Sequence, residues 1–180
     1  MSAFILPAIL AANVFAAKDK GYIKASGNPE DAAVFINGKY VGPASRYTVT
    51  DKYQAPLGQV EVTIRDPRCQ DYTTKVMVAP GKTVHVHYKL ARVAPSKPPY
   101  GTFRLTGAEQ ESYAPAAAGD GAVYLNNKYY GYVDELKSMT SGILLNPGTY
   151  NLFIDSGTYG SIRQQITIQA DKTTLFRITQ

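Results

Sequence analysis

The sequence predicts an all-β protein built from two tandem small antiparallel β-sandwich repeats that are joined by a proline-rich linker. Three observations predict this fold class. The chain carries 14 Tyr, 15 Gly and 11 Pro, which together with frequent Val, Ile and Thr favours strands and turns. Two stretches of the chain align with each other, and a cluster of prolines separates them. With 44% hydrophobic residues, the 180-residue chain has enough apolar surface for a folded core.

The N-terminal segment, residues 1–17, is expected to be a signal peptide that is cleaved after Ala16 or Ala17. Its apolar stretch carries no charge and ends in small residues, as the cleavage site of an export signal does. The segment lacks a basic region ahead of the apolar stretch, which leaves two alternatives: a true start further upstream, or an uncleaved anchor. Pro7 and the short length argue against a spanning helix. We therefore expect a periplasmic or extracellular location at the cell surface.

The internal repeat determines the predicted domain organisation. Residues 31–42 align without gaps on residues 120–131, and most of the differences are conservative. The match extends to both sides, and the later glycine turns and strands keep the same spacing in both copies. This pattern predicts a first repeat at residues 21–90 and a second repeat at residues 101–180.

Each repeat is predicted to consist of short strands that alternate apolar and polar residues. At the start of the first repeat, Ile23 and Ala25 face one way while Tyr22 and Lys24 face the other. Later strands are expected at Val60 to Ile64, Thr73 to Val78 and Thr83 to Leu90, with counterparts at Tyr150 to Ile154, Arg163 to Ile168 and Thr173 to Ile178.

Turn residues mark the hairpins between these strands. Asn37-Gly38 predicts a two-residue type I′ turn, because both of its central positions need a positive φ that Asn and Gly tolerate. Asn126-Asn127 keeps this chemistry in the second repeat. Gly58 and Gly148 mark a second pair of equivalent turns.

The linker, residues 91–100, contains Pro95, Pro98 and Pro99. Prolines prevent a strand ladder from continuing and favour a stiff, extended chain. The second repeat also contains an insertion rich in Ala and Pro at Ser112 to Gly119, which is expected to form a mobile surface loop.

The first repeat resembles the PEGA domain family. The motif that carries the resemblance is Pro29-Glu30-Asp31-Ala32, followed by the strand Val34-Phe35-Ile36 and the turn Asn37-Gly38-Lys39. Asp31 stands where the family has Gly, and the second repeat lacks the Pro-Glu pair. The resemblance implies a tandem of PEGA-like β-sandwiches, the second copy degenerate, in a bacterial envelope or surface protein that acts without catalytic residues.

Candidate chemical groups are few. His85 and His87 lie two apart on one predicted strand face and are the only candidates for a metal site, but no third ligand lies at a recognised spacing, so no metal is predicted. Cys69 has no intrachain partner and is interpreted as an incidental loop thiol, with intermolecular pairing as the alternative. Arg68 beside it is expected to favour the thiolate modestly.

The sequence favours a protein that is not an enzyme and needs no cofactor. No nucleophile, base and oxyanion motif occurs together, and the acidic pairs, such as Asp134-Glu135, fall in predicted loops. The net charge is +5 and the basic residues are scattered, which excludes a nucleic-acid surface.

The predicted function is that of an exported structural or protein-interaction module of the bacterial cell envelope, with an envelope protein as partner. The alternative is a module that binds cell-wall glycan through exposed tyrosines, because a tyrosine ring offers a flat apolar face and a hydroxyl. The candidate ligand-binding tyrosines are Tyr40, Tyr129, Tyr130 and Tyr132. Placement of some of these rings in a sandwich core or in cross-strand pairs is the competing interpretation.

Overall fold

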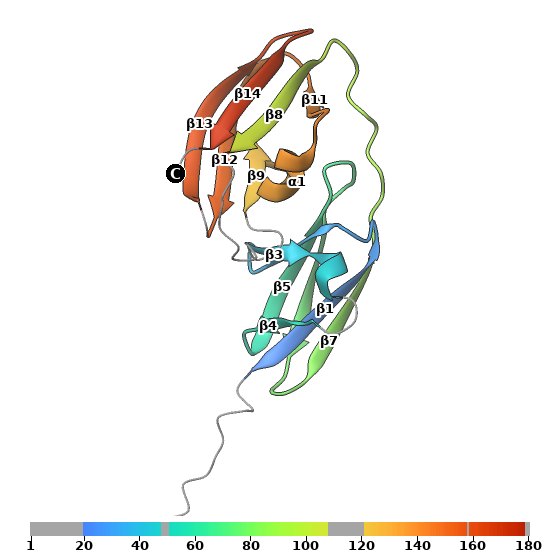
Figure 1. Cartoon of the computed structure of the whole chain (residues 1–180). Coiled ribbons are helices and arrows are strands. Elements are labelled where there is room, and N and C mark those ends of the chain that lie inside the picture. Colours follow the sequence, from blue (N-terminus) through green and yellow to red (C-terminus); the bar gives the residue numbers. More distant parts are fainter. Residues whose placement is uncertain (1–19, 48–50, 108–120, 158, 179–180) are drawn as a thin grey trace, which may run out of the picture.

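The computed structural model describes residues 20–47, 51–107, 121–157 and 159–178, and this part of the chain is nearly all β. Figure 1 shows two halves, one formed by β1 to β7 and the other by β8 to β14, with an extended segment running between them along one side. The all-β prediction is confirmed.

The first half contains seven strands and one short 3-10 helix. They are β1 (Gly21–Asn28), β2 (Ala33–Ile36), β3 (Lys39–Pro43), η1 (Ala44–Tyr47), β4 (Tyr53–Ala55), β5 (Gly58–Arg65), β6 (Tyr72–Val78) and β7 (Thr83–Lys89). The second half has the same order of elements with an α-helix in place of η1. They are β8 (Gly101–Gly107), β9 (Ala122–Leu125), β10 (Lys128–Tyr132), α1 (Val133–Ser138), β11 (Ile143–Leu145), β12 (Gly148–Ser156), β13 (Gly160–Ile168) and β14 (Thr173–Ile178).

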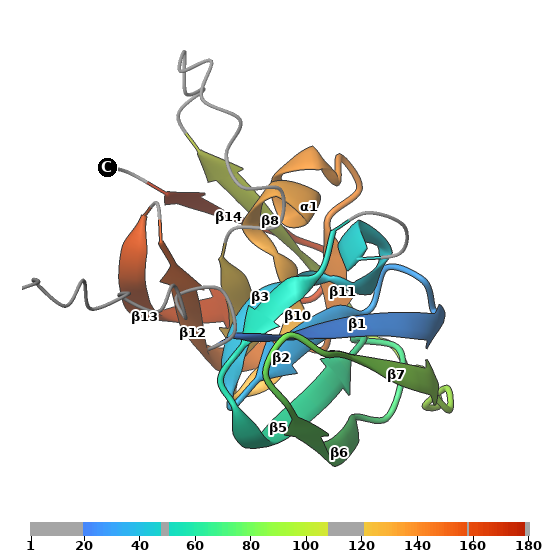
Figure 2. The same cartoon turned by 90° about the horizontal axis from the view of Figure 1, so that it is seen from below.

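Each half is a sandwich of one four-stranded and one three-stranded sheet with the same strand order in both halves. The sheets of the first half run β3-β2-β5-β6 and β4-β1-β7, and those of the second half run β10-β9-β12-β13 and β11-β8-β14. Seen from below, β1 and β7 of the first half lie in one layer and β5 and β6 in the other (Figure 2).

The expectation that all sheets are antiparallel is wrong for the two three-stranded sheets. β1 pairs in parallel with β7, and β8 pairs in parallel with β14. A parallel neighbour needs a long crossover connection. In the first half the chain runs through β2 to β6 before β7 returns beside β1.

Two-residue hairpins join β2 to β3 and β9 to β10. Ile36 pairs with Lys39 across the first turn, and Leu125 pairs with Lys128 across the second. Asn37 and Gly38 have φ of 48° and 78°, and Asn126 and Asn127 have φ of 48° and 65°. These values are the left-handed conformations that a type I′ turn requires.

Each sandwich has its own apolar core. In the first half, the inward side chains of β2 and β5 meet β1 and β7, and the buried residues include Ile23, Val34, Val62 and Val86. In the second half, Phe103 and Leu105 of β8 pack against β9 and β12. The predicted alternation of β1 is confirmed, because Ile23 and Ala25 are buried while Tyr22 and Lys24 are only partly covered.

Helix α1 replaces a segment that the sequence predicts as a loop. Asp134 and Glu135 lie in its first turn, and Val133 and Leu136 are buried in the second core. A six-residue helix has little stability of its own, so burial of these two side chains against the sandwich holds it in place.

Three expectations concern residues outside the described part of the chain. They are the signal peptide at 1–17, its cleavage after Ala16 or Ala17, and the inserted loop at Ser112 to Gly119. The helices that the structure does describe are too short to cross a bilayer.

The junction and cleft between the two halves

The two halves meet through the outer faces of their four-stranded sheets. A third cluster of buried residues, separate from both sandwich cores, forms this junction and contains Ala33, Phe35, Ala122 and Tyr129, with Tyr40 and Tyr124 packed against it. Phe35 is 1% exposed and Tyr129 is 6% exposed. The outer face of each four-stranded sheet is therefore covered where β2 and β9 face each other.

Aromatic rings make most of the contact. The Phe35 and Tyr129 ring centroids lie 5.5 Å apart with the rings nearly perpendicular, and Tyr40 stacks on Tyr132 with centroids 6.4 Å apart. Such edge-to-face and offset arrangements stabilise aromatic pairs beyond the area they bury. The Arg65 guanidinium lies 4.9 Å from the Phe35 ring centroid and extends the cluster at one side.

Equivalent residues of the two repeats form this junction. In the gap-free alignment of residues 31–42 on residues 120–131, Ala33 corresponds to Ala122, Phe35 to Tyr124, and Tyr40 to Tyr129. The same patch of each half thus meets its counterpart, which is the arrangement of a two-fold symmetric dimer interface. The chain contains both partners of that interface.

The junction changes the interpretation of the candidate tyrosines. Burial raises the pKa of the Tyr129 hydroxyl strongly, and Tyr130 is half-buried against the second core. The set that would present an exposed face to a sugar ring is therefore not formed, because Tyr129 is buried between the halves. The alternation of β10 placed Tyr129 on the outer side of its sheet, and the other half covers that side.

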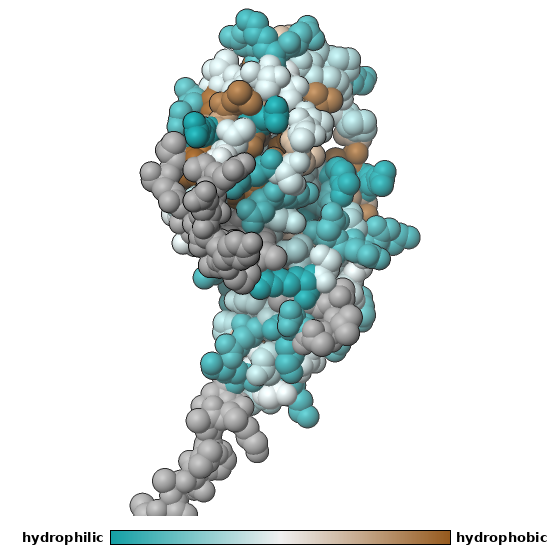
Figure 3. Space-filling model, viewed as in Figure 1, coloured by the Kyte–Doolittle hydropathy of each residue, from teal (hydrophilic) through white to brown (hydrophobic). Residues whose placement is uncertain are grey.

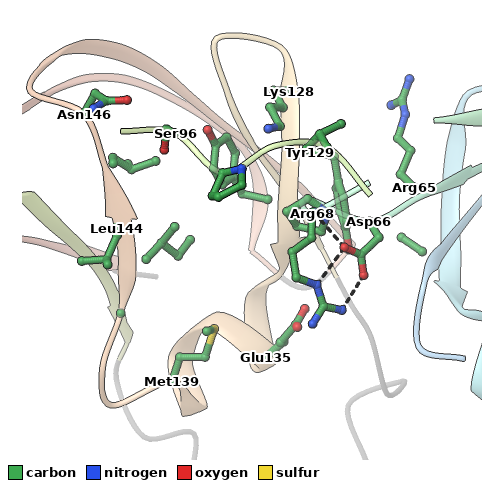
Figure 4. Close-up of a pocket in the computed structure, with 18 of the residues that line it drawn as sticks. Arg65, Asp66, Arg68, Ser96, Lys128, Tyr129, Glu135, Met139, Leu144 and Asn146 are labelled. Carbon is green, nitrogen blue, oxygen red and sulfur yellow. Dashed lines mark hydrogen bonds and ion pairs between the residues drawn. The ribbon is translucent and has the colours of Figure 1, made fainter. Parts of the chain in front are cut away.

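A cleft of about 650 Å³ opens beside the aromatic junction. Its first wall comes from the first half, at Asp31 and the segment that follows β5, and its second wall comes from Glu135, Met139 and Leu144 of the second half. The segment from Val93 to Ser96 forms a third side. Figure 4 shows charged groups at the Arg68 end and aliphatic groups at the Leu144 end.

Asp66 and Arg68 form the charged pair at one end of the cleft. The Arg68 guanidinium donates hydrogen bonds to both Asp66 carboxylate oxygens, at 2.9 and 2.6 Å, and the Arg68 backbone N–H donates to Asp66 Oδ1 at 2.8 Å. Burial of Asp66 opposes its ionisation, but these bonds and the charge of Arg68 outweigh it, so the pKa of the Asp66 carboxyl is lowered. Asp66 therefore closes a turn after β5 and also holds Arg68 at the cleft.

The equivalent position of the second half is Ser156, whose hydroxyl also closes a turn. Ser156 Oγ accepts a hydrogen bond from the Tyr159 backbone N–H at 2.9 Å. A hydroxyl closes the same kind of turn as a carboxylate does, but it brings no charge. The Asp66–Arg68 pair is thus specific to the first half.

Glu135 from α1 adds a further carboxylate at this end. Its side chain points toward the Asp66–Arg68 pair (Figure 4). Burial raises the pKa of the Glu135 carboxyl, and the negative charges of Asp31 and Asp66 raise it further. The sequence analysis considers Glu135 only as part of an acidic pair in a predicted loop, because nothing local indicates that α1 carries it to the cleft.

Hydrogen bonds hold the linker against both halves. The Asn146 side-chain amide donates hydrogen bonds to the Lys97 and Pro99 carbonyl oxygens, at 2.6 and 3.0 Å. At its other end, the Val93 backbone N–H donates to the Arg68 carbonyl oxygen at 2.9 Å. The linker, which the sequence predicts as a stiff, extended segment, thus also forms one side of the cleft.

Cys69 lies beneath the linker and not on an exposed loop. It is buried, and its backbone forms an isolated antiparallel β-bridge with Arg92. Burial raises the pKa of the Cys69 thiol, and the Asp66 carboxylate raises it further, outweighing the effect of Arg68. Arg68 does lower the pKa of the Cys69 thiol, as the sequence predicts, but burial and Asp66 outweigh this effect. Burial also removes the sulfur from contact with a second chain.

His85 and His87 share one exposed face of β7, with ring centroids 6.3 Å apart. His87 Nδ1 lies 3.0 Å from Ser26 Oγ, within hydrogen-bond distance. Over the described residues, no group of three or more His, Cys, Asp or Glu side chains is placed to hold a metal ion. The equivalent strand β14 carries Leu175 and Arg177 at these positions.

Comparison with known proteins identifies the family that the first half matches. Residues 21–94 match the PEGA domain family. This match covers the first sandwich and the start of the linker, and it agrees with the resemblance carried by Pro29-Glu30-Asp31-Ala32. PEGA domains are non-catalytic modules of extracellular or envelope proteins.

Other comparisons give only distant similarities. The chain is similar to the Bacillus anthracis TIE protein at 13% identity, with a TM-score of 0.32, covering 89% of this chain and 33% of that chain. It is also similar, at 14% identity and a TM-score of 0.18, to SGBP-B of a Bacteroides ovatus mixed-linkage glucan utilization locus, solved in complex with a mixed-linkage heptasaccharide, covering 84% and 42% of the two chains. This chain thus spans less than half the length of either structure, and both TM-scores are too low to indicate a shared fold. No curated protein matches the chain.

Proposed function

We propose that this protein is an exported, non-enzymatic interaction module of the bacterial cell envelope, made of two PEGA-like sandwiches of which the second is a divergent copy. The match of residues 21–94 to the PEGA domain family carries the proposal. The identical strand order of the second half supports the second copy. Residues 1–17 act as the export signal, and the protein works in the periplasm or at the cell surface.

The junction between the halves supports an interaction role. Aromatic packing between the two four-stranded sheets makes the halves one body, and the cleft beside the junction combines groups from both halves and the linker. Sites at domain boundaries are common places for ligands because they join surfaces that neither domain has alone. The cleft is therefore the surface where we place the contact with a partner.

The glycan-binding alternative receives less support from the geometry. The rings that the sequence suggests for it contact one another across the junction, with Tyr129 buried and Tyr40 stacked on Tyr132. A sugar ring needs an aromatic face that is open to solvent.

Affinity capture from envelope extract tests the proposal. The bait is the chain from Ala17 to Gln180, a heat-unfolded sample is the control, and binding to purified cell-wall glycan is measured in parallel. We expect the folded bait to retain a defined envelope protein, identified by mass spectrometry, and no glycan. Retention of glycan in the absence of protein would instead support the carbohydrate-binding alternative.

A further inference from the structure

The charged end of the cleft is acidic although the whole chain has a net charge of +5. Three carboxylates, Asp31, Asp66 and Glu135, lie around the Arg68 guanidinium, and Arg92 is a second positive charge that acts on Asp66. Arg65 lines the cleft too, but its charge is balanced by Asp71 at 2.9 Å. The acidic excess at this end is therefore not neutralised by the neighbouring arginine.

The other cation that lines the cleft does not balance this end. Lys128 lies on the far side from Glu135 in Figure 4, and its Nζ is 5.4 Å from the Tyr130 ring centroid. A positively charged group from outside the chain would be attracted to the space beside Glu135.

A metal ion does not suit this position. The three carboxylates come from separate elements, and no metal-ligating group of three is formed among the described residues. An ammonium or guanidinium group suits it better, because it carries its charge on a side chain and donates hydrogen bonds to carboxylates that are spread apart.

The opposite end of the cleft is aliphatic and open to solvent. Six large hydrophobic side chains of the described residues are exposed, and three of them, Val93, Met139 and Leu144, line this cleft. Leu144 is 59% exposed. On the face seen in Figure 3, hydrophobic residues form small patches in a largely hydrophilic surface. Concentration of exposed aliphatic groups in a hollow is typical of an interaction site.

We propose that the cleft binds an extended segment of a partner polypeptide that places a large aliphatic side chain against Met139 and Leu144 and a Lys or Arg beside Glu135. This inference rests on the proposed function and names the chemistry of the partner. The aliphatic side chain removes Leu144 and Met139 from water, and the cation compensates the negative charge that Arg68 and Arg92 leave unbalanced. Backbone groups of the segment lie along the linker side of the cleft, at Val93 to Ser96.

Selection of peptides on the full chain tests this inference. A phage-displayed library of random octapeptides is selected on the wild-type chain and, in parallel, on a Leu144→Ser/Glu135→Gln double variant. We expect the wild type to enrich peptides that combine an aliphatic residue with Lys or Arg, and the double variant to lose this enrichment. Enrichment of acidic peptides, equal enrichment on both chains, or no enrichment would overturn the inference.

Two matched pairs of single variants separate binding from folding. Leu175 on β14 is 63% exposed and lies outside the cleft, so Leu175→Ser is the control for Leu144→Ser. Asp134, the neighbour of Glu135 on α1, does not line the cleft, so Asp134→Asn is the control for Glu135→Gln. We expect each cleft variant to weaken binding of a selected, dye-labelled peptide at least about tenfold and each control to leave it unchanged.

The result also distinguishes this inference from the proposed function. If the peptides fail while the envelope capture succeeds and is equal for wild type and the Leu144→Ser variant, the protein is an interaction module that uses another surface. If the capture fails as well, the proposed function fails with it.

Discussion

Asp66 shows how one side chain serves both a turn and the cleft. Its carboxylate is 4% exposed and accepts hydrogen bonds from the backbone and the guanidinium of Arg68. Its counterpart Ser156 shows that the turn alone does not need the charge. The Asp66 charge therefore serves to pair with Arg68, and the contribution of this pair to stability can be measured.

Replacement of Asp66 by Asn removes the charge and keeps an oxygen for the turn. We expect the free energy of unfolding at pH 7 to fall by about 2 kcal/mol, the size typical of hydrogen bonds to charged groups. The folded-state pKa of Asp66 is lowered, so the carboxylate contributes fully above its ordinary value near 3.8 and loses this contribution as the pH falls through the folded-state value. The difference between wild type and variant should therefore narrow below about pH 4.

Urea titrations at several pH values measure this difference. Asp71→Asn is the matched control, because Asp71 pairs with Arg65 at the surface with 53% of its side chain exposed. Exposed pairs contribute under about 1 kcal/mol. Equal losses for the two variants would show that burial of Asp66 gives its pair with Arg68 no special contribution.

The Cys69 thiol gives a second prediction at this scale. Because burial and the Asp66 carboxylate raise its pKa, the thiol stays protonated at pH 8, and its position under the linker restricts access. Alkylation by iodoacetamide, followed by mass spectrometry, should be at least about tenfold slower in the native protein than in denaturant. Equal rates in both states would contradict the buried position.

Among the elements, the β2–β3 and β9–β10 hairpins follow from local sequence. Turns of this kind depend on two residues that tolerate positive φ, so the order of amino acids is enough to place them. Gly38 has a φ of 78° with no atom within 4 Å of an added Cβ. A substitution at this position is therefore limited by backbone conformation and not by space.

Gly38→Ala is expected to lower the free energy of unfolding by about 1 to 2 kcal/mol, the cost of a left-handed conformation for a residue with a Cβ. Gly38→Asn should cost much less, because Asn127 adopts a φ of 65° at the equivalent position of the second half. Thermal unfolding of the two variants measures the difference. A large loss with Asn would show that the two hairpins are not equivalent.

Elements that depend on distant contacts were not predictable in the same way. The sequence indicates the strands β5, β6 and β7, but the parallel partner of β1 is set by the return of the chain after five intervening strands. Helix α1 buries only two apolar residues, Val133 and Leu136, and they become buried only by packing against β8 and the second core. Two residues do not make a helical pattern that sequence reasoning can separate from a loop.

The same limit applies to the candidate site. The alternation of β2 and β10 places Phe35 and Tyr129 on the outer faces of their sheets, where a single sandwich would expose them. Their burial comes from the other half, which no local pattern encodes. The sequence analysis identifies Tyr129 as a candidate contact group but not Phe35, and it does not identify the surface that they contact.

At the scale of the whole molecule, the aromatic junction should couple the stability of the two halves. Phe35→Ala removes a ring that belongs to neither sandwich core. We expect a loss of about 4 kcal/mol, typical of a buried Phe, and separate unfolding of the halves in place of one transition. Circular dichroism during urea unfolding measures this, and hydrogen exchange should increase in β2 and also in β9 and β10 of the other half.

Phe103→Ala is the matched control for this variant. Phe103 is also 1% exposed, but it lies within the core of the second half. Its loss should raise hydrogen exchange mainly within the second sandwich. A single transition with unchanged exchange in β10 for Phe35→Ala would refute coupling through the junction.

The symmetry of the junction has a consequence for how chains find the right partner. Because matching faces meet, the contact itself does not distinguish the second half of one chain from the second half of another. The linker makes this distinction, since it keeps the two faces of one chain at an effective concentration on the order of millimolar. Pairing between chains competes only when the protein itself approaches that concentration. The proline-rich linker therefore favours pairing within one chain over linking chains into longer assemblies.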